Sequence, residues 1–247
     1  MARIRSPFII TGTLGEINFY VYDGINVARR AGGGFNRKDI KTRPEMRGVR
    51  EINGEFTHCS KVKSVFMRAL RPYFVGIRGK RIHCEMVGMF TRVKKRDAVS
   101  GRGERTIEAG LASADGLREL SSYSYPKAYS LYGVLGCRFT VDLAQEHCTF
   151  PDLDPALTVF PEGATHLGLR FGIVCMDFVA LKAHLFPAEE HFVPRGAGPG
   201  PLTLALSSRV EGTGRRIAFL GVRFYQEVNG AYHMLEEGRG AAVVGVG

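Results

Sequence analysis

The sequence predicts an α+β protein with an N-terminal β-hairpin, a basic helical segment and a C-terminal antiparallel β-sandwich of jelly-roll or immunoglobulin-like type. Three observations support this prediction. Apolar residues alternate on both sides of Asp23-Gly24, as in a hairpin. After Pro44 the apolar residues recur every three or four positions, as in helices. After Gly136 the chain consists of short apolar runs separated by turns rich in Pro, Gly and Asp.

The composition is that of a globular protein large enough to bury a substantial core. The chain has 247 residues, of which 45% are hydrophobic and 23% are charged. Its 31 glycines favour turn-rich β structure over a helical bundle. We expect a first domain at 1–120 and a sandwich domain at 137–247, joined by the tyrosine-rich connector "SSYSYPKAYSLYG", or both parts in one intertwined unit.

The helical segment is predicted to contain three amphipathic helices, one with a proline near its start, one ending before Pro72 and one beginning near Gly79. A short fourth helix follows in "ASADGLREL", with Ser113 or Asp115 as its N-cap. The apolar faces of the first three are Met46, Val49, Ile52 and Phe56; Val62, Val65, Phe66, Ala69 and Leu70; and Ile82, Met86, Met89, Phe90 and Val93.

Seven strands are predicted after Gly136. The strongest local signal is Asn229-Gly230, a tight-turn pair between "FYQEV" and "AYHML". The candidate strands are "CRFTVDL", "ALTVF", "THLGLRFGIVCMDF", "VALKAHL", "PLTLALSSRV", "RIAFLGVRFYQEV" and "AAVVGV".

The positive charge is unevenly distributed, which suggests a polyanionic partner for one part of the molecule. The net charge is +10, yet residues 1–110 hold 23 Lys and Arg against 10 Asp and Glu. The basic stretch "RVKKRDAVSGRGERT", residues 92–106, follows the third predicted helix. We predict a non-specific phosphate-binding surface, for DNA or RNA, at Arg92, Lys94, Lys95, Arg96, Arg102 and Arg105.

The alternative is a solvated loop with internal ion pairs, such as Arg102 or Arg105 with Glu104 or Glu108. Tyrosines of the connector could stack on bases, or pack at a sheet edge with their hydroxyls in water. These tyrosines are Tyr123, Tyr125, Tyr129 and Tyr132.

Motifs of catalysis and of cofactor binding are missing from the sequence. Neither a phosphate-binding Walker loop, a dinucleotide fingerprint nor a G-x-S-x-G elbow is present. Three adjacent His-Cys pairs lack the spacing of zinc ligands, because neighbouring side chains point apart. We therefore predict no catalytic residue, no metal and no cofactor. The segment "AEEH" offers Glu189 and His191 as a less favoured glycan- or substrate-binding loop.

A cytoplasmic or virion location is expected. The apolar run near the start, "FII", is too short for a signal peptide, and no run approaches the ~20 residues of a membrane span. The five cysteines are widely spaced and odd in number, which favours reduced, mostly buried thiols.

Five stretches resemble a family of uncharacterised Bacteroidota proteins that share the pattern I-x-G-x-[IL]-x-x-x-x-F-Y. They are "MARIRSPFIITGTLGEINFY", "KTRPEMRGVREINGEF", "GRGERTIEAGL", "GATHLGL" and "RFYQEVNGAYHML", which together span nearly the whole chain. The most specific positions are Gly12, Phe19, Tyr20, Arg50, Glu51, Asn53, Arg102 to Arg105 and Gln226 to Gly230. The family has no established activity, so the resemblance implies one intact architecture and a bacterial, mobile-element or phage origin, but no site.

These observations favour a non-enzymatic structural protein that assembles with copies of itself, such as a shell or virion component with a basic segment facing nucleic acid. The second hypothesis is a non-specific nucleic-acid-binding accessory protein. A glycan-binding sandwich ranks third, because the chain contains no tryptophan.

Overall fold

The computed structural model describes residues 2–3, 8–31, 37–75 and 81–247. The chain divides into two compact units, Met1–Arg50 (unit 1) and Glu51–Gly247 (unit 2). The division lies well before the connector at 121–133, because the helices after residue 50 share a hydrophobic core with the C-terminal sheet.

Unit 1 contains a small antiparallel sheet with the strand order β1-β4-β3-β2. The turn at Asp23 and Gly24 has positive φ at both residues, 54° and 78°, which matches the twist of a two-residue hairpin. This confirms the predicted N-terminal hairpin. The elements are β1 (Ala2–Arg3), β2 (Gly12–Leu14), β3 (Ile17–Tyr22), β4 (Ile25–Arg30), α1 (Arg37–Thr42) and the 3-10 helix η1 (Pro44–Met46).

The helical segment differs from the prediction in one respect, since its first two helices are one continuous helix. Helix α2 runs without a break through "THCSK", which contains no glycine or proline, and Cys59 continues its buried stripe between Glu55 and Val62. The other predicted helices are confirmed, and Ser113 caps the short one by accepting a hydrogen bond from Gly116 N. The helices are α2 (Arg47–Ala69), α3 (Arg71–Phe74), α4 (Arg81–Lys94), α5 (Ile107–Leu111), α6 (Ala114–Ser121) and α7 (Leu131–Leu135).

Unit 2 also holds a seven-stranded and a three-stranded antiparallel sheet. The larger has the order β10-β8-β12-β14-β5, with β9 also paired to β8 and β13 to β12; the smaller has the order β11-β7-β6. The strands are β5 (Ser124–Tyr125), β6 (Thr140–Asp142), β7 (His147–Leu153), β8 (His166–Asp177), β9 (Lys182–Pro187), β10 (His191–Pro194), β11 (Gly200–Ala205), β12 (Arg215–Val228), β13 (Ala231–Met234) and β14 (Gly240–Val246).

One predicted strand, "ALTVF" at 156–160, is wrong. The segment begins in a turn, in which the carboxylate of Asp154 accepts a hydrogen bond from Ala156 N at 2.9 Å. Asp-Pro sequences favour such turns over strands. The hairpin at Asn229-Gly230 is confirmed by β12 and β13, which pair from Val228 and Ala231 outward.

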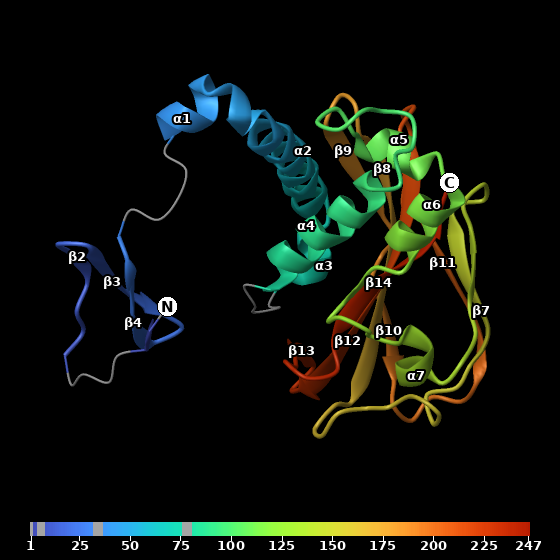
Figure 1. Ribbon diagram of the computed structural model, residues 1–247. Helices are drawn as coiled ribbons and strands as arrows, with labels where there is room; N and C mark the ends of the chain where they lie inside the picture. The colour runs from blue at the N-terminus through green and yellow to red at the C-terminus, as the bar shows by residue number, and fades with distance from the viewer. Residues whose placement is uncertain (1, 4–7, 32–36, 76–80) are drawn as a thin grey trace. The chain divides into compact units, whose positions relative to one another are not determined.

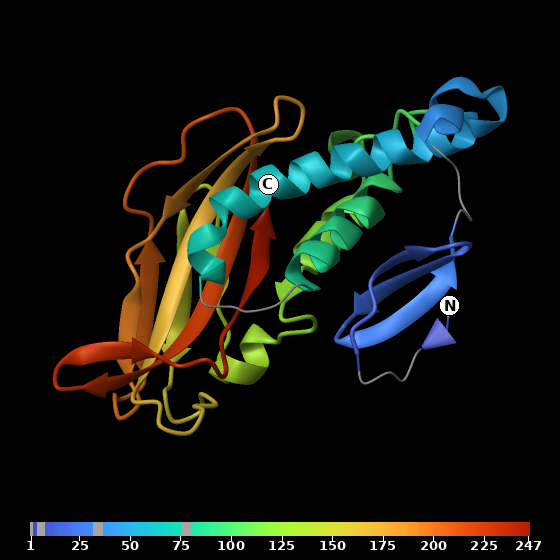
Figure 2. The same cartoon turned by 90° about the vertical axis from the view of Figure 1, so that its left-hand side faces the viewer.

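The large sheet is covered on both faces (Figure 1). On β8, Phe171 and Ile173 face a core shared with β7 and β11, whereas Val174 and Met176 face the helices. The helical side contains a chain of aromatic contacts, with ring centroids of Phe66 and Phe90 5.4 Å apart. Figure 2 shows α2 and α4 side by side on this helical side.

Tyr73 of α3 fits into a notch that two glycines leave in the sheet. A Cβ atom on Gly172 would lie 2.5 Å from the Tyr73 hydroxyl oxygen, and one on Gly221 would lie 2.9 Å from Cδ1 of the same ring. Glycine is therefore required on both β8 and β12 for α3 to approach this closely. In the described part of the chain, no helix is long and apolar enough to cross a bilayer.

The notch predicts a coupling between Gly221 and Tyr73. Gly221→Ala should destabilise unit 2 by about 1–3 kcal/mol, because the added methyl overpacks the site. The cost should be much smaller in a Tyr73→Ala background, as measured by a double-mutant cycle with urea unfolding. Gly200→Ala, where a Cβ would meet nothing within 4 Å, is the control. An equal loss of unfolding free energy in both backgrounds would show that Gly221 and Tyr73 are not in steric contact.

Candidate functional site

The basic loop, residues 92–106, is organised around one buried carboxylate. Asp97 Oδ1 accepts hydrogen bonds from Val99 N at 3.0 Å and Ser100 N at 2.9 Å, and Oδ2 accepts one from Thr106 N at 2.9 Å. Burial acts to raise the pKa of Asp97, but these donors outweigh it and lower the pKa to about 2. The loop thus has a defined conformation.

A buried ion pair ties the start of the loop to α2. Lys94 is only 6% exposed, and its ammonium pairs with the carboxylate of Glu55. Glu55 also accepts a hydrogen bond from Gly103 N at 2.8 Å. Burial acts to raise the pKa of Glu55, yet the hydrogen bonds from Lys94 and Gly103 and the charge of Arg105 lower it overall. Lys94 therefore supports the fold, and its charge is not presented to solvent.

Two further cations of the loop are paired with acids on α6. The Nε atom of Arg92 lies 2.7 Å from Glu119 Oε2, and Arg96 lies 3.3 Å from Glu119 and 3.7 Å from Asp115. The guanidinium groups of both arginines lower the pKa of Glu119. These pairs compensate much of the charge on this side of the loop.

The remaining three residues have three different environments. Arg102 is exposed and lies 3.5 Å from Glu51. Arg105 is partly buried, and its Nε has no hydrogen-bond partner in the described part of the chain. Lys95 is exposed, and no carboxylate of the described residues pairs with it. Four of the six predicted cations thus have carboxylate partners, and the phosphate-binding surface stays a prediction.

The alternative prediction of internal pairing names the wrong acids for the loop. Arg102 pairs with Glu51, and Glu108 pairs with Arg215 at 2.9 Å. The acids that pair with the loop cations lie outside the loop, on α2, which precedes it in the sequence, and on α6, which follows it. Of the connector tyrosines, Tyr123 and Tyr125 are buried and Tyr132 is exposed.

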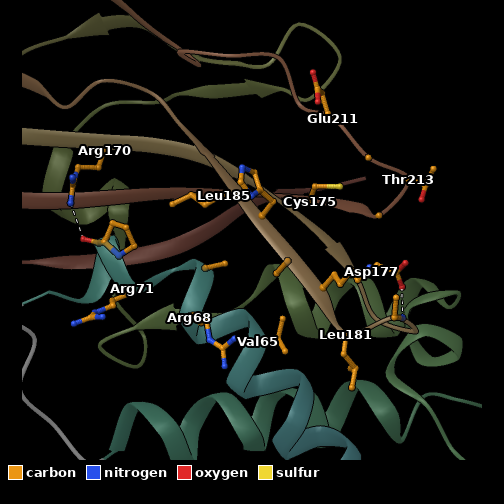
Figure 3. A pocket seen from close by; sticks show the side chains of 18 of the residues that line it. Val65, Arg68, Arg71, Arg170, Cys175, Asp177, Leu181, Leu185, Glu211 and Thr213 are labelled. Atoms are coloured by element: carbon orange, nitrogen blue, oxygen red, sulfur yellow. Dashed lines mark hydrogen bonds between the residues drawn. The ribbon is translucent and has the colours of Figure 1, made fainter.

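A second charged region, the arginine cleft, lies between the C-terminal part of α2, α3, the β8–β9 hairpin and the segment before β12. It encloses about 1300 Å³. Figure 3 shows Arg68 and Arg71 on the helical wall and Arg170 on the sheet. Its walls carry apolar and charged side chains, among them Val65, Arg68, Ala69, Arg71, Arg170, Asp177, Leu181, Lys182, Ala183, Leu185, Glu211 and Arg223.

Two of these arginines are fixed in place. Arg170 and Arg223 both donate to the carbonyl oxygen of Pro72, Arg170 at 2.8 Å. Arg170 also pairs with Glu190 at 3.1 Å, and the Tyr225 hydroxyl donates to Glu190 at 2.6 Å. Burial, followed by the Glu190 contact, raises the pKa of Tyr225. Glu190 therefore belongs to a structural network beside the cleft.

Arg68 and Arg71 differ from this pair because they are exposed and have no ion-pair partner among the described residues. Sequence reasoning missed the cleft, since its walls come from four separate segments. The only local signal is the spacing of Val65, Arg68, Ala69 and Arg71, which places two cations beside an apolar stripe on one helical stretch.

The three adjacent His-Cys pairs lie on α2, α4 and β7. In the described ranges no group of three or more His, Cys, Asp or Glu side chains could hold a metal. His58 Nε2 accepts from Ile107 N at 3.5 Å, and burial, followed by the nearby lysines, lowers its pKa. The five cysteines are free, and Cys84 alone among them is exposed.

The pKa of Asp97 predicts acid sensitivity. Its folded pKa of about 2 lies below the usual aspartate value of 3.8, so its stabilisation is complete above the unfolded pKa and is lost as pH falls toward 2. We expect about 1–2 kcal/mol to be lost over this range. Asp97→Asn should destabilise the protein at pH 7, because its amide would face the Thr106 N–H, and should flatten the slope of stability against pH. An unchanged slope in urea titrations would contradict this role.

The buried pair predicts a strong asymmetry between single and double variants. Lys94→Met should cost about 3–5 kcal/mol, because it leaves the Glu55 carboxylate buried without its cation. Lys94→Met combined with Glu55→Gln should regain more than half of this loss, since the amide still accepts from Gly103. Lys95→Met is the matched control and should change stability by less than about 0.5 kcal/mol. A double variant as unstable as the single one would exclude the pair as the cause.

Comparisons of the chain with protein-family models, with curated proteins and with solved structures gave no match. The interpretation of the loop and of the cleft therefore depends on their own residues.

Proposed function

We propose that the protein is a non-enzymatic structural subunit that assembles with copies of itself, as subunits of a virion or another protein shell do. The observation that carries this proposal is the apolar surface of the unit 1 sheet. Eight large apolar side chains of unit 1, five of them in its sheet, are exposed: Phe8, Ile9, Ile10, Leu14, Ile17, Val21, Tyr22 and Ile25.

The pairing register places several of these side chains on one face of the sheet. Leu14 lies opposite Ile17, and Phe19 lies opposite Ala28. Because side chains alternate along a strand, Ile17, Phe19 and Val21 point to the same side. Leu14, Ile17 and Val21 are 76%, 47% and 41% exposed. Leu14, Ile17, Phe19, Val21 and Ala28 form what we call the apolar face.

Small sheets need a packed apolar face for stability, and an exposed apolar patch marks an interaction surface. Two sheets commonly bury apolar faces against each other, and a two-fold axis lets one patch serve both subunits. The same register places Arg30 opposite Ile17 and Asn26 opposite Val21, so polar side chains border the apolar ones on this face, and Arg30 lies 3.2 Å from Glu16. We therefore propose that the apolar face packs against the same face of a second copy.

Unit 2 offers a second apolar surface for assembly. Ile52 and Phe56, one turn apart on α2, are both more than half exposed. The shared core of the seven-stranded and three-stranded sheets supports a β-sandwich, which suits packing in shells. The jelly-roll or immunoglobulin-like type of that sandwich stays a prediction.

The second candidate function, non-specific nucleic-acid binding, is favoured by exposed cations of α1. Arg37, Lys38 and Lys41 are exposed on this short helix. They are compatible with assembly as well, since a shell subunit can present a basic surface to the nucleic acid that it encloses.

Self-association through the apolar face is testable with paired variants. The purified protein should sediment as an oligomer, and regular particles should be visible by electron microscopy after nuclease treatment. Leu14→Glu with Ile17→Glu should raise the dissociation constant at least about tenfold, because two charges would be buried at the interface. Thr13→Glu, on the opposite face of the same strand, is the control. A wild-type monomer at high concentration, or equal effects of both changes, would reject the proposal.

A further inference from the structure

We propose that the arginine cleft binds an extended acidic segment of a partner protein, which adds as a further strand to the outer edge of β9. This site lies wholly in unit 2 and does not depend on self-assembly through unit 1. Its support comes from three properties of the cleft: a free strand edge, an apolar wall and uncompensated cations.

The outer edge of β9 has backbone groups available for pairing. Ala188 N donates to Phe171 O at 2.9 Å, so these two residues form a hydrogen-bonded pair of the antiparallel β8–β9 ladder. Hydrogen-bonded and non-hydrogen-bonded pairs alternate along such a ladder, and Ala183 and Leu185 occupy non-hydrogen-bonded positions. It follows that the peptide groups of Ala183 and Leu185 point away from β8. In the described part of the chain β9 pairs with β8 alone. Two residues therefore offer both donors and acceptors to an incoming strand.

The far end of this edge is closed. Ser207 N donates to Pro187 O at 3.1 Å, and Pro187 has no N–H to offer. The available edge is therefore short and lies within the cleft, which limits pairing to a short segment and disfavours unlimited edge-to-edge association.

The wall beside this edge is apolar. Val65 and Ala69 of α2 lie across from Leu181, Ala183 and Leu185, and all five line the cleft. Figure 3 shows Val65 between the helix and the hairpin that carries Leu181 and Leu185. A strand on β9 would place alternate side chains toward this wall, so apolar residues are favoured at every second position.

The charge of the cleft favours acidic residues at the other positions of the bound strand, between the apolar ones. Five cations, Arg68, Arg71, Arg170, Lys182 and Arg223, line it against two acids, Asp177 and Glu211. Arg170 is compensated by Glu190. Arg68 and Arg71 are not compensated within the described residues, and arginine binds carboxylates through paired hydrogen bonds. The complementary ligand is therefore an extended peptide that alternates apolar and acidic side chains.

Two other occupants fit less well. Single-stranded nucleic acid is usually bound by aromatic stacking, and the described lining residues include no Phe, Tyr or Trp. Strand β4 of a second copy ends in Arg29 and Arg30, and these cations would be repelled by a cleft that is already cationic.

The test uses the full-length protein and a fluorescein-labelled octapeptide of alternating Val and Glu, blocked at both ends. Fluorescence anisotropy should show saturable binding that weakens with salt, whereas the Val-Lys octapeptide should not bind. Arg68→Glu with Arg71→Glu should weaken binding at least about tenfold. Ala183→Pro should weaken it several-fold, because it removes an outward N–H and leaves the β8 ladder intact.

Lys95→Glu is the control for charge reversal, since it reverses one exposed charge outside the cleft where the arginine variant reverses two, and it should leave affinity nearly unchanged. Circular dichroism checks that each variant is folded; if Ala183→Pro is not, the arginine pair decides. The proposal is overturned if the Val-Glu and Val-Lys peptides bind alike, if the arginine variant binds as tightly as the control, or if only a short oligothymidylate binds.

Discussion

Strands β8 and β12 pair from His166 and Tyr225 to Met176 and Arg215, and both faces of this pair are buried. A strand pair of this kind cannot be left bare on either side, because each face presents a row of large apolar side chains. The helices cover one face, and β7 with β11 cover the other. The same pair of strands determines the position of α3. Gly172 and Gly221 leave space for the Tyr73 ring. Arg170 and Arg223 donate hydrogen bonds to the Pro72 carbonyl oxygen.

Buried polar groups add specificity to this packing. Removing an arginine or a lysine from water is costly, and the cost is offset only where hydrogen bonds are well aligned. Arg223 achieves this with a backbone carbonyl, and Lys94 achieves it with Glu55. Such groups reject alternative packings, because a shifted helix would leave a buried charge unpaired. The arginine cleft is one consequence, as α3 is held at a fixed place beside the β8–β9 hairpin.

Local signals in the sequence were enough to predict the elements whose causes are local. Asp23-Gly24 and Asn229-Gly230 specify hairpins by their own backbone preferences, and α4 is visible in its apolar period. Two predictions failed because they did not take neighbouring residues into account. The segment "THCSK" continues α2, because it contains no residue that breaks a helix. The segment 156–160 has the apolar composition of a strand, but Asp154 stabilises a turn at its start. The cleft was not predictable, because Arg68, Arg170 and Glu211 come from segments far apart in the chain.

The distribution of charge shows why counting cations along a sequence is a poor measure of anion binding. The basic loop holds six Lys and Arg side chains within 15 residues, yet four of these six cations pair with carboxylates from α2 and α6. Arg68 and Arg71, in contrast, are exposed, have no ion-pair partner among the described residues and lie beside a free strand edge. We expect binding of an anionic partner to depend on charge that remains uncompensated after folding, and on that basis the cleft is a better candidate for anion binding than the loop.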